Sequence, residues 1–153
     1  MTESTEAEGL GHLLWRIIKL HRIHAHTVLD QLGLYRGQHF VLAALWEQEG
    51  LTQSELAERT MVRPATMTAS LQRMEAAGLI ERRPDPHDQR VMRVYLTEAG
   101  RALKESVNAA WRALEERTFE GFTPQEQEQL RCFMLHIIAN LERETENIDV
   151  RKI

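Results

Sequence analysis

The stretch that decides the fold is residues 51–100, LTQSELAERTMVRPATMTASLQRMEAAGLIERRPDPHDQRVMRVYLTEAG. A first helix is expected to begin after Thr52, because Thr52 followed by Glu55 is a capping-box pattern. Pro64 suits the first position of a second helix, where its missing N–H costs nothing. That second helix should end at Gly78, since glycine adopts the left-handed C-terminal cap most easily. These signals predict a helix, a turn and a second helix in direct succession.

The second helix has two contrasting faces. Met67, Leu71 and Met74 recur at helical spacing and predict one apolar stripe that packs inward. The remaining positions are small, hydroxylic or cationic: Arg63, Ala65, Thr66, Thr68, Ala69, Ser70 and Arg73. Small residues allow close approach, hydroxyls bond phosphates or base edges, and arginines match phosphate and guanine geometry. This surface is typical of a recognition helix in a DNA major groove, although an ordinary helical hairpin is an alternative.

A hairpin is expected to follow the second helix. Two strand-like runs, residues 79–83 and 91–96, flank the loop 84–90, whose prolines remove backbone donors and stiffen the chain. The hairpin carries arginines at positions 82, 83, 90 and 93, which suit a minor-groove arm better than a packed edge. A helix-turn-helix followed by such a hairpin is a winged helix.

With these elements the sequence resembles the MarR (multiple antibiotic resistance regulator) family of winged-helix transcription factors. The resemblance rests on three segments, RMEAAGLIERR, DPHDQR and VYLTEAG. In the family these read R-L-E-x-x-G-L-[IV], then D-x-R, then L-T-x-x-G. The matching residues are Arg73, Met74 (leucine in the family), Glu75, Gly78, Leu79, Ile80, Asp88, Arg90, Leu96, Thr97 and Gly100. The resemblance implies that Arg90 reaches the minor groove and that Asp88 holds its guanidinium in place.

We therefore predict a mainly α-helical chain with a small β-wing, a winged helix-turn-helix with N- and C-terminal dimerisation helices. It would bind double-stranded DNA through recognition helix 64–77 and wing 84–92, with repression as the expected role. The predicted DNA contacts are Gln53, Ser54, Arg63, Pro64, Ala65, Thr66, Thr68, Ser70, Arg73, Arg82, Arg83, His87, Asp88 and Arg90. A winged helix used only for protein–protein contact is the alternative, and such a module has no need of Arg90 positioned by Asp88.

The charge distribution is compatible with this role. The 153 residues carry a formal net charge of −4. Residues 63–93, however, contain six arginines against four carboxylates, whereas residues 120–149 contain two arginines against seven carboxylates. The segment that would meet phosphate is therefore net positive within an acidic chain. A footprint of this size predicts DNA affinity that is salt-sensitive without being extreme.

Further helices are expected on both sides of the winged helix. The apolar periodicity predicts them over residues 10–32, 36–47, 98–118 and 124–144. Gly33 should end the first of these, Thr97 should cap the third, and Thr123 with Glu126 forms a capping box for the last. The acidic, polar residues 1–9 are expected to be disordered.

The outer helices predict a homodimer. Their apolar faces are wide, as in helices that are buried against a second chain. We expect residues 10–35 and 98–153 to form a helical dimerisation region beside the DNA-binding region 36–97, in one compact domain. A two-fold dimer places its recognition helices about one DNA turn apart, so the operator should be a pseudo-palindrome. A monomer whose outer helices pack on its own core is the alternative, whereas the resembled family is dimeric.

Three tryptophans suggest a place for an effector. By the resemblance, Trp15, Trp46 and Trp111 surround the cleft between the dimerisation and DNA-binding parts, where relatives bind phenolic compounds and release DNA. Arg16, His21 and Tyr35 could supply polar contacts for a small aromatic or lipophilic ligand. Ordinary core positions are an alternative at least as good for tryptophans at helical spacing.

Metal and thiol chemistry are weakly indicated. His21 and His24 share one face of the first predicted helix, and some relatives sense zinc near there, which leaves a metal-responsive regulator as an alternative. The helix over 98–118 contains no histidine to complete such a site, so no metal and no cofactor are expected. The single cysteine, Cys132, is expected to be buried and inert.

Enzymatic and membrane functions find no support in the sequence. Glycine-rich phosphate loops, G-x-S-x-G and C-x-x-C are all absent. His87 beside Asp88 has no accompanying nucleophile, so an exposed wing tip is the better interpretation. No run of about 18 apolar residues exists, and the N-terminus is unlike a signal peptide. A cytoplasmic protein is expected, which a single cysteine also fits.

Overall fold

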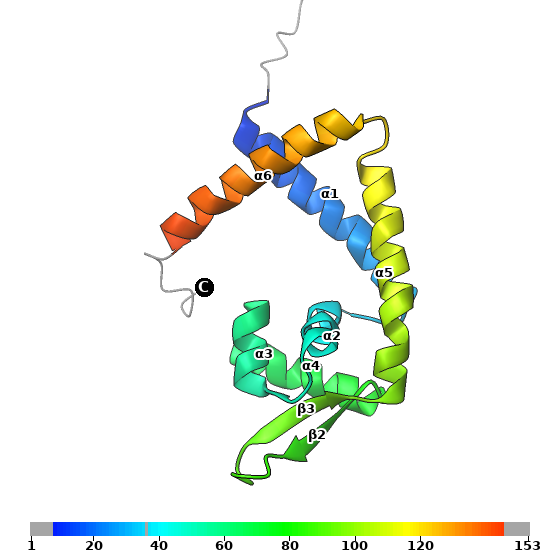
Figure 1. The fold of residues 1–153 in the computed structure, drawn as a ribbon, viewed down its shortest axis with the longest axis vertical. Coiled ribbons are helices and arrows are strands. Elements are labelled where there is room, and N and C mark those ends of the chain that lie inside the picture. Colours follow the sequence, from blue (N-terminus) through cyan, green and yellow to red (C-terminus); the bar gives the residue numbers. More distant parts are fainter. Residues whose placement is uncertain (1–7, 36, 146–153) are drawn as a thin grey trace, which may run out of the picture. The chain divides into compact units, whose positions relative to one another are not determined.

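The chain is mainly helical, as predicted, and carries a small antiparallel sheet. The computed structural model describes residues 8–35 and 37–145. In chain order the elements are α1 (Leu10–Asp30), α2 (Gln38–Glu47), β1 (Leu51–Thr52), α3 (Gln53–Thr60), α4 (Pro64–Ala76), β2 (Ile80–Pro84), β3 (Met92–Leu96), α5 (Glu98–Thr118) and α6 (Pro124–Thr145) (Figure 1).

The element boundaries fall within two residues of those expected from the sequence. The first helix ends at Asp30 and the second begins at Gln38. Strand β1 was not predicted, because two residues are too short for a periodic pattern. The expectation of disorder for residues 1–9 is wrong at its last two positions, where Glu8 pairs with Arg16 and Gly9 is the N-cap of α1. Residues 1–7, the expected helical position of Arg36 and residues 146–153 of the expected dimerisation region lie outside the described residues.

The sheet has the strand order β1-β3-β2, with both pairings antiparallel. Leu51 pairs with Val94 across β1 and β3, and Ile80 pairs with Leu96 across β2 and β3. The hairpin of β2 and β3 projects beyond α2, α3 and α4 in Figure 1. β1 therefore ties the start of the helix-turn-helix to the base of this hairpin, which is the wing.

The hydrophobic core includes the buried faces of α3 and α4, the two helices of the helix-turn-helix. Met67, Leu71 and Met74, the predicted stripe of α4, are at most 1% exposed, and Leu56 of α3 is fully buried. Val94 from the wing base joins the same cluster. Burial of each such side chain stabilises the fold by roughly 1.5–3 kcal/mol. The predicted packing of α4 is thus confirmed.

The predicted helix ends are also confirmed. The Thr52 N–H donates to the Glu55 carboxylate (2.7 Å), and the Glu55 N–H donates to the Thr52 hydroxyl (3.2 Å). Gly78 has φ 71°, and the Leu79 N–H donates to the Met74 carbonyl (3.0 Å), which closes α4 in a Schellman motif. These local bonds fix where α3 begins and where α4 ends.

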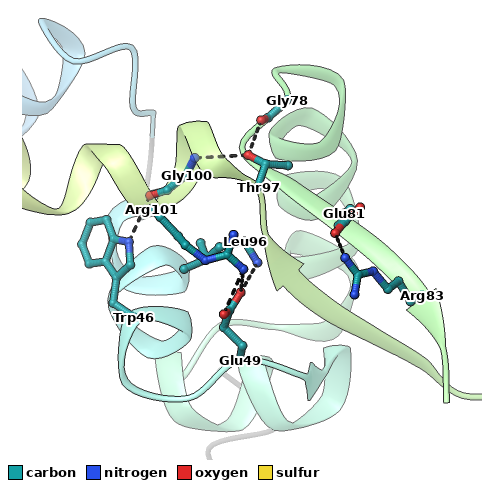
Figure 2. Close-up of polar contacts among 9 residues, drawn as sticks. All are labelled: Trp46, Glu49, Gly78, Glu81, Arg83, Leu96, Thr97, Gly100 and Arg101. Atoms are coloured by element: carbon teal, nitrogen blue, oxygen red, sulfur yellow. Dashed lines mark hydrogen bonds and ion pairs between the residues drawn. The ribbon is translucent and has the colours of Figure 1, made fainter. Parts of the chain in front are cut away.

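The wing is joined to α5 by close backbone contacts (Figure 2). The Thr97 hydroxyl donates to the Gly78 carbonyl (2.6 Å) and accepts from the Gly100 N–H (3.2 Å). The Trp46 indole of α2 donates to the Gly100 carbonyl (3.0 Å). A Cβ on Gly100 would lie 2.1 Å from the Leu79 carbonyl oxygen, so only glycine fits at this contact.

A carboxylate reinforces the same junction. Glu49 accepts from the Leu96 N–H (2.8 Å) at the end of β3 (Figure 2). It also accepts from the Arg101 guanidinium at 2.8 and 3.0 Å. The loop after α2, the end of β3 and the start of α5 are therefore held at one point.

The chain divides into two compact units, one extending to Leu114 and the other beginning at Glu115. In the first unit, α1 buries only Ala25 and Leu29. In the second, α6 buries no residue, and Cys132 is exposed, so the prediction of a buried cysteine is wrong for the single chain. No helix in the described part of the chain combines the length and hydropathy needed to cross a bilayer.

The exposed apolar side chains lie mainly on these two helices. Those of α1 are Leu10, Leu13, Leu14, Trp15, Ile17, Ile18, Leu20 and Ile23. Those of α6 are Phe133, Met134, Leu135, Ile137, Ile138 and Leu141. A single chain leaves the predicted apolar faces of α1 and α6 in contact with water.

Candidate nucleic-acid interface

The turn between α3 and α4 depends on a left-handed residue. Met61 has φ 52°, and its side chain is 86% exposed. The Val62 N–H donates to the Ala57 carbonyl (3.0 Å), which closes α3. Arg63 then serves as the N-cap of α4 and Pro64 occupies its first turn, as predicted. Arg63 and Pro64 are both exposed, so the N-terminal end of α4 faces solvent.

Two of the predicted DNA-contacting residues bond to each other. The Gln53 amide donates to the Thr68 hydroxyl (2.5 Å), and that hydroxyl donates to the Pro64 carbonyl (3.0 Å). The hydroxyl hydrogen of Thr68 is thereby engaged, and α3 is tied to α4. Ser54, the next residue of α3, is exposed.

The exposed face of α4 is narrower than the sequence suggested. Ala65, Thr66 and Arg73 are exposed, whereas Ser70 is half-buried with its hydroxyl 4.0 Å from the Met74 sulfur. Gln72, which is not among the predicted DNA contacts, is exposed on this face. The polar side chains that α4 offers to a partner are therefore chiefly Thr66, Gln72 and Arg73.

The wing is organised around one buried carboxylate. Asp85 is 7% exposed, accepts from the His87 N–H (2.7 Å) and the Asp88 N–H (3.1 Å), and pairs with the Arg93 guanidinium. The Arg93 bond and the two amides lower the pKa of Asp85 to about 2. Arg93 also donates to the Gly50 carbonyl (2.7 Å). This network fastens the wing loop to the loop that precedes β1.

The arginines of the interface fall into two groups. Arg82 donates to Glu75 from Nε (3.1 Å) and from a terminal nitrogen (2.6 Å). Arg83 pairs with Glu81 and lies 4.8 Å from the centre of the Tyr95 ring. Figure 2 shows the Arg83–Glu81 pair along β2. Both guanidiniums are thus already partly neutralised.

The second group consists of Arg63, Arg73 and Arg90. All three are exposed, and their side chains have no hydrogen bond or ion pair within residues 8–35 and 37–145. They come from the start of α4, its last turn and the wing tip. Unpaired guanidiniums in these places are available to phosphate oxygens or groove edges.

The structure differs from the expected role of Asp88. Its carboxylate accepts from the backbone N–H of Arg90 (3.1 Å), not from the guanidinium. Asp88 therefore shapes the turn at the wing tip, and the carboxylate that holds an arginine is Asp85, with Arg93. His87 and Asp88 are both exposed at this tip.

A cavity of about 920 Å³ lies beside α1, α2 and α5. His21 and Trp111, two of the predicted effector residues, line it, and their rings are stacked with centroids 6.1 Å apart. The remaining four lie outside the lining. Trp15 and Tyr35 are exposed, Arg16 pairs with Glu8 (2.5 Å), and Trp46 bonds Gly100 at the wing junction.

His39 and Phe40 of α2 also line this cavity. The His39 ring lies 3.9 Å from the Phe40 ring and 5.3 Å from the Trp111 ring, measured between centroids. Both His39 ring nitrogens are buried and have no hydrogen-bond partner among the residues described. Burial lowers the pKa of His39 to about 4, so its imidazole is neutral at pH 7.

The described residues offer little for metal or thiol chemistry. Nowhere in that part of the chain do three His, Cys, Asp or Glu side chains converge in a way that could hold a metal ion. The Cys132 thiol donates to the Glu128 carboxylate (3.9 Å).

Sequence reasoning missed several residues that the geometry brings forward. Asp85 forms the wing clamp with Arg93, which the sequence had placed on a minor-groove arm. Gln72 lies on the exposed face of α4, and His39 lines the cavity. The buried Asp85 had a local signal, because Asp followed by Pro in a turn often accepts from the next backbone amides. The positions of Gln72 and His39 depended on exact helical phase and tertiary packing.

Comparison with known proteins places this geometry in context. Residues 34–92 match a family model described as MarR family. The repressor MdtR of Bacillus subtilis is 34% identical over 118 residues, which cover 77% of this chain and 74% of MdtR. The repressor Rv2887 of Mycobacterium tuberculosis is 31% identical over 122 residues, which cover 80% of this chain and 88% of that protein.

Solved structures share the fold. The apo form of MarR from E. coli superposes with a TM-score of 0.75 at 25% identity, covering 87% of this chain and 98% of that one. A MarR family regulator from Silicibacter pomeroyi is 32% identical with a TM-score of 0.66, covering 94% of this chain and 92% of the other.

Proposed function

The chain belongs to the MarR family of winged-helix transcriptional regulators, which bind DNA and are not enzymes, and we propose that it is a homodimeric repressor of a pseudo-palindromic operator. The observation that carries this proposal is the surface made by α4 and the wing. It presents Arg63, Arg73 and Arg90 without partners among the described residues, on elements fixed by the Asp85–Arg93 clamp. Since its target is chromosomal DNA, the repressor acts in the cytoplasm.

The contacts divide by groove. Helix α4 enters the major groove with its exposed N-terminal end, as recognition helices do. Thr66 meets base edges or phosphate there, and Arg63 and Arg73 bind phosphates on either side. Ser54, which is exposed near the start of α3, contacts the sugar-phosphate backbone of the DNA. Arg90 at the wing tip enters the minor groove, because the negative potential of a narrow minor groove attracts an inserted arginine.

The other predicted contacts take supporting parts. Arg82 and Arg83 already pair with carboxylates, so they add less to DNA affinity than the unpaired arginines. Gln53 and Thr68 hold α3 against α4 and thereby set the angle of the recognition helix. Pro64 and Ala65 allow close approach, and His87 and Asp88 shape the wing tip.

Dimerisation would account for the exposed apolar side chains. Within one chain no residue of α6 is buried, and six of its large apolar side chains are 38–57% exposed. Apolar surface of this extent in a monomer marks an interaction site. A second copy covering α1 and α6 supplies the missing partner and gives the two-fold arrangement that a pseudo-palindrome requires.

The cavity beside α1, α2 and α5 supports a second part of the proposal, release of DNA by a small aromatic or lipophilic effector. Its walls combine Ile17, Ile18, Phe40 and Trp111 with the polar His21 and Arg22. Largely apolar walls with a few polar groups are typical of small-ligand sites. Phenolic and aromatic carboxylic acids that lower operator affinity for the wild type but not for Trp111→Leu would support it. Equal effects on both proteins would contradict it.

The proposed DNA function is tested with Arg90→Ala. We expect this substitution to lower operator affinity by about 1–3 kcal/mol, because the wing loses its unpaired minor-groove cation. Fluorescence anisotropy with the full chain measures the change, at one salt concentration and with circular dichroism to establish folding.

Two further variants sharpen this test. Arg82→Ala should cost less than Arg90→Ala, because Glu75 already neutralises Arg82. Arg112→Ala, on an exposed part of α5 away from the wing, should leave affinity unchanged. A folded Arg90→Ala variant that binds as well as the wild type would contradict the role of the wing and favour a protein-binding winged helix.

A further inference from the structure

We propose that Gln72 determines operator sequence by hydrogen-bonding the adenine of an A·T base pair in each half-site. The inference rests on the proposed function, since it requires α4 in the major groove. Gln72 is exposed, and its amide has no hydrogen-bond partner in the described part of the chain. A long polar side chain that is unpaired on the exposed face of a recognition helix is free to bond a base.

The position of Gln72 on α4 suits base reading. Ala65, Thr68, Ala69 and Gln72 follow the spacing i, i+3, i+4 and i+7, which homeodomain recognition helices use to read the major groove. These positions lie away from the buried stripe that ends at Met74. Ala65 and Gln72 are exposed and Ala69 is half-buried. These four positions, which we call the reading row, therefore lie on one side of α4.

Helix geometry directs Gln72 toward the end of α4 that enters the groove. Long side chains in helices point back toward the N-terminus and cover the preceding turn. For Gln72 that turn contains Ala69, whose methyl group is too small to obstruct the Gln72 side chain. Thr68, the other polar residue in the row, already bonds Gln53 and the Pro64 carbonyl. The Gln72 carboxamide is thus the uncommitted polar group of this row.

The chemistry of the carboxamide selects the base. Glutamine offers one acceptor oxygen and a donor NH₂, which match the N6 donor and N7 acceptor of adenine in a bidentate pair. Guanine presents two acceptors at the same edge, so the glutamine oxygen would be left without a partner there. The Ala69 methyl can contact a thymine methyl on the same side of the helix. Together these groups favour A·T over G·C.

The experiment is a selection from a randomised duplex library with the full-length wild type, Gln72→Ala and Gln72→Glu. Gln31→Ala, at an exposed residue after α1, is the matched control. The wild type and the control should enrich A·T at one position of each half-site. Gln72→Ala should lose that preference alone, a change of about 5- to 150-fold in competition binding. Gln72→Glu should shift the preference toward C·G, because a carboxylate accepts from cytosine N4.

The outcomes separate the two proposals. If wild type and Gln72→Ala enrich the same sequences, Gln72 does not read a base, while the proposed repressor function stands. Weaker binding of Gln72→Ala with unchanged preference at every position also overturns the inference, since it indicates a backbone contact. A wild-type chain that enriches no sequence overturns the proposed function, and the role of Gln72 with it.

Discussion

Gly100 holds the wing against α5, and glycine is the only amino acid small enough for this position. Its backbone lies against the Leu79 carbonyl, its own carbonyl accepts from Trp46, and its N–H donates to Thr97. Three segments that are distant in sequence therefore meet at one backbone position. Any side chain there must push the base of the wing away from α5.

We expect Gly100→Ala to lower the free energy of unfolding by about 1–3 kcal/mol, the usual cost of overpacking. The added methyl would lie 2.1 Å from a backbone oxygen, which cannot move aside as a flexible side chain could. Urea denaturation at fixed chain concentration measures the loss. Gly11→Ala, with no atom within 4 Å of its new methyl, is the control and should not destabilise. Equal stability of Gly100→Ala and wild type would contradict the close contact.

His39 makes stability depend on pH. Its folded pKa of about 4 lies below its unfolded value of about 6.5, so the unfolded chain binds the proton first. Stability should therefore fall as pH drops from about 6.5 toward 4. His39→Phe should flatten this decline, measured as the free energy of unfolding at several pH values, whereas Gln31→Ala, at an exposed residue after α1, should not. An identical decline in His39→Phe would assign it to other groups.

At the scale of elements, the wing is a hairpin stiffened from within. Asp85 accepts two backbone amides and the Arg93 guanidinium, and Arg93 reaches the Gly50 carbonyl. A hairpin tip held this way loses little further conformational freedom when it enters a groove. Because the wing tip is already ordered in the free protein, it loses less conformational entropy on association, which favours binding.

We expect Asp85→Asn to loosen the wing tip. In the wild type the pKa of Asp85 is lowered to about 2, so the stability that its ionised form adds is fully present above about pH 3.8 and is lost as pH falls through about 2. The His87 and Asp88 amides should exchange faster in Asp85→Asn at pH 5, measured by NMR. The difference from wild type should shrink as pH falls through about 2. Asp30→Asn at the end of α1 is the control, and equal exchange in Asp85→Asn and wild type would contradict the clamp.

The local elements could be predicted from the sequence because their signals lie within a few residues. Thr52 with Glu55, Pro64 and Gly78 fixed α3 and α4 through contacts inside one turn of the chain. β1 was missed because it exists only through pairing with β3. The bond of Glu49 to Arg101 spans 52 positions, and no periodic pattern reports such a contact.

The candidate site could be predicted only in outline. The residue types of α4 indicated a DNA-binding face, but burial of Ser70 and bonding of Thr68 to Gln53 required the packed structure. The family pattern suggested that Asp88 holds Arg90, whereas the structure pairs Asp85 with Arg93. Both aspartates lie in the same loop, and only the path of the turn decides which carboxylate is buried.

At the scale of the whole molecule, charge and apolar surface lie on different elements. Residues 63–93 are net positive in a chain of net charge −4, and the large exposed apolar side chains lie mainly on α1 and α6. This separation lets one surface meet DNA while another meets a second chain. If Arg63 and Arg73 of each protomer neutralise one phosphate each, log K should fall with log salt with a slope of about −4.

The most direct test of the repressor function is a fluorescence titration of the full chain against duplex DNA from upstream of its own coding region. It is run at two salt concentrations with excess competitor DNA, beside a library of genomic fragments. We expect saturable, competitor-resistant binding to specific fragments, with two chains per site and weaker binding at higher salt. Binding that is weak and equal for every fragment, upstream and genomic, would contradict sequence-specific recognition by α4 and the wing.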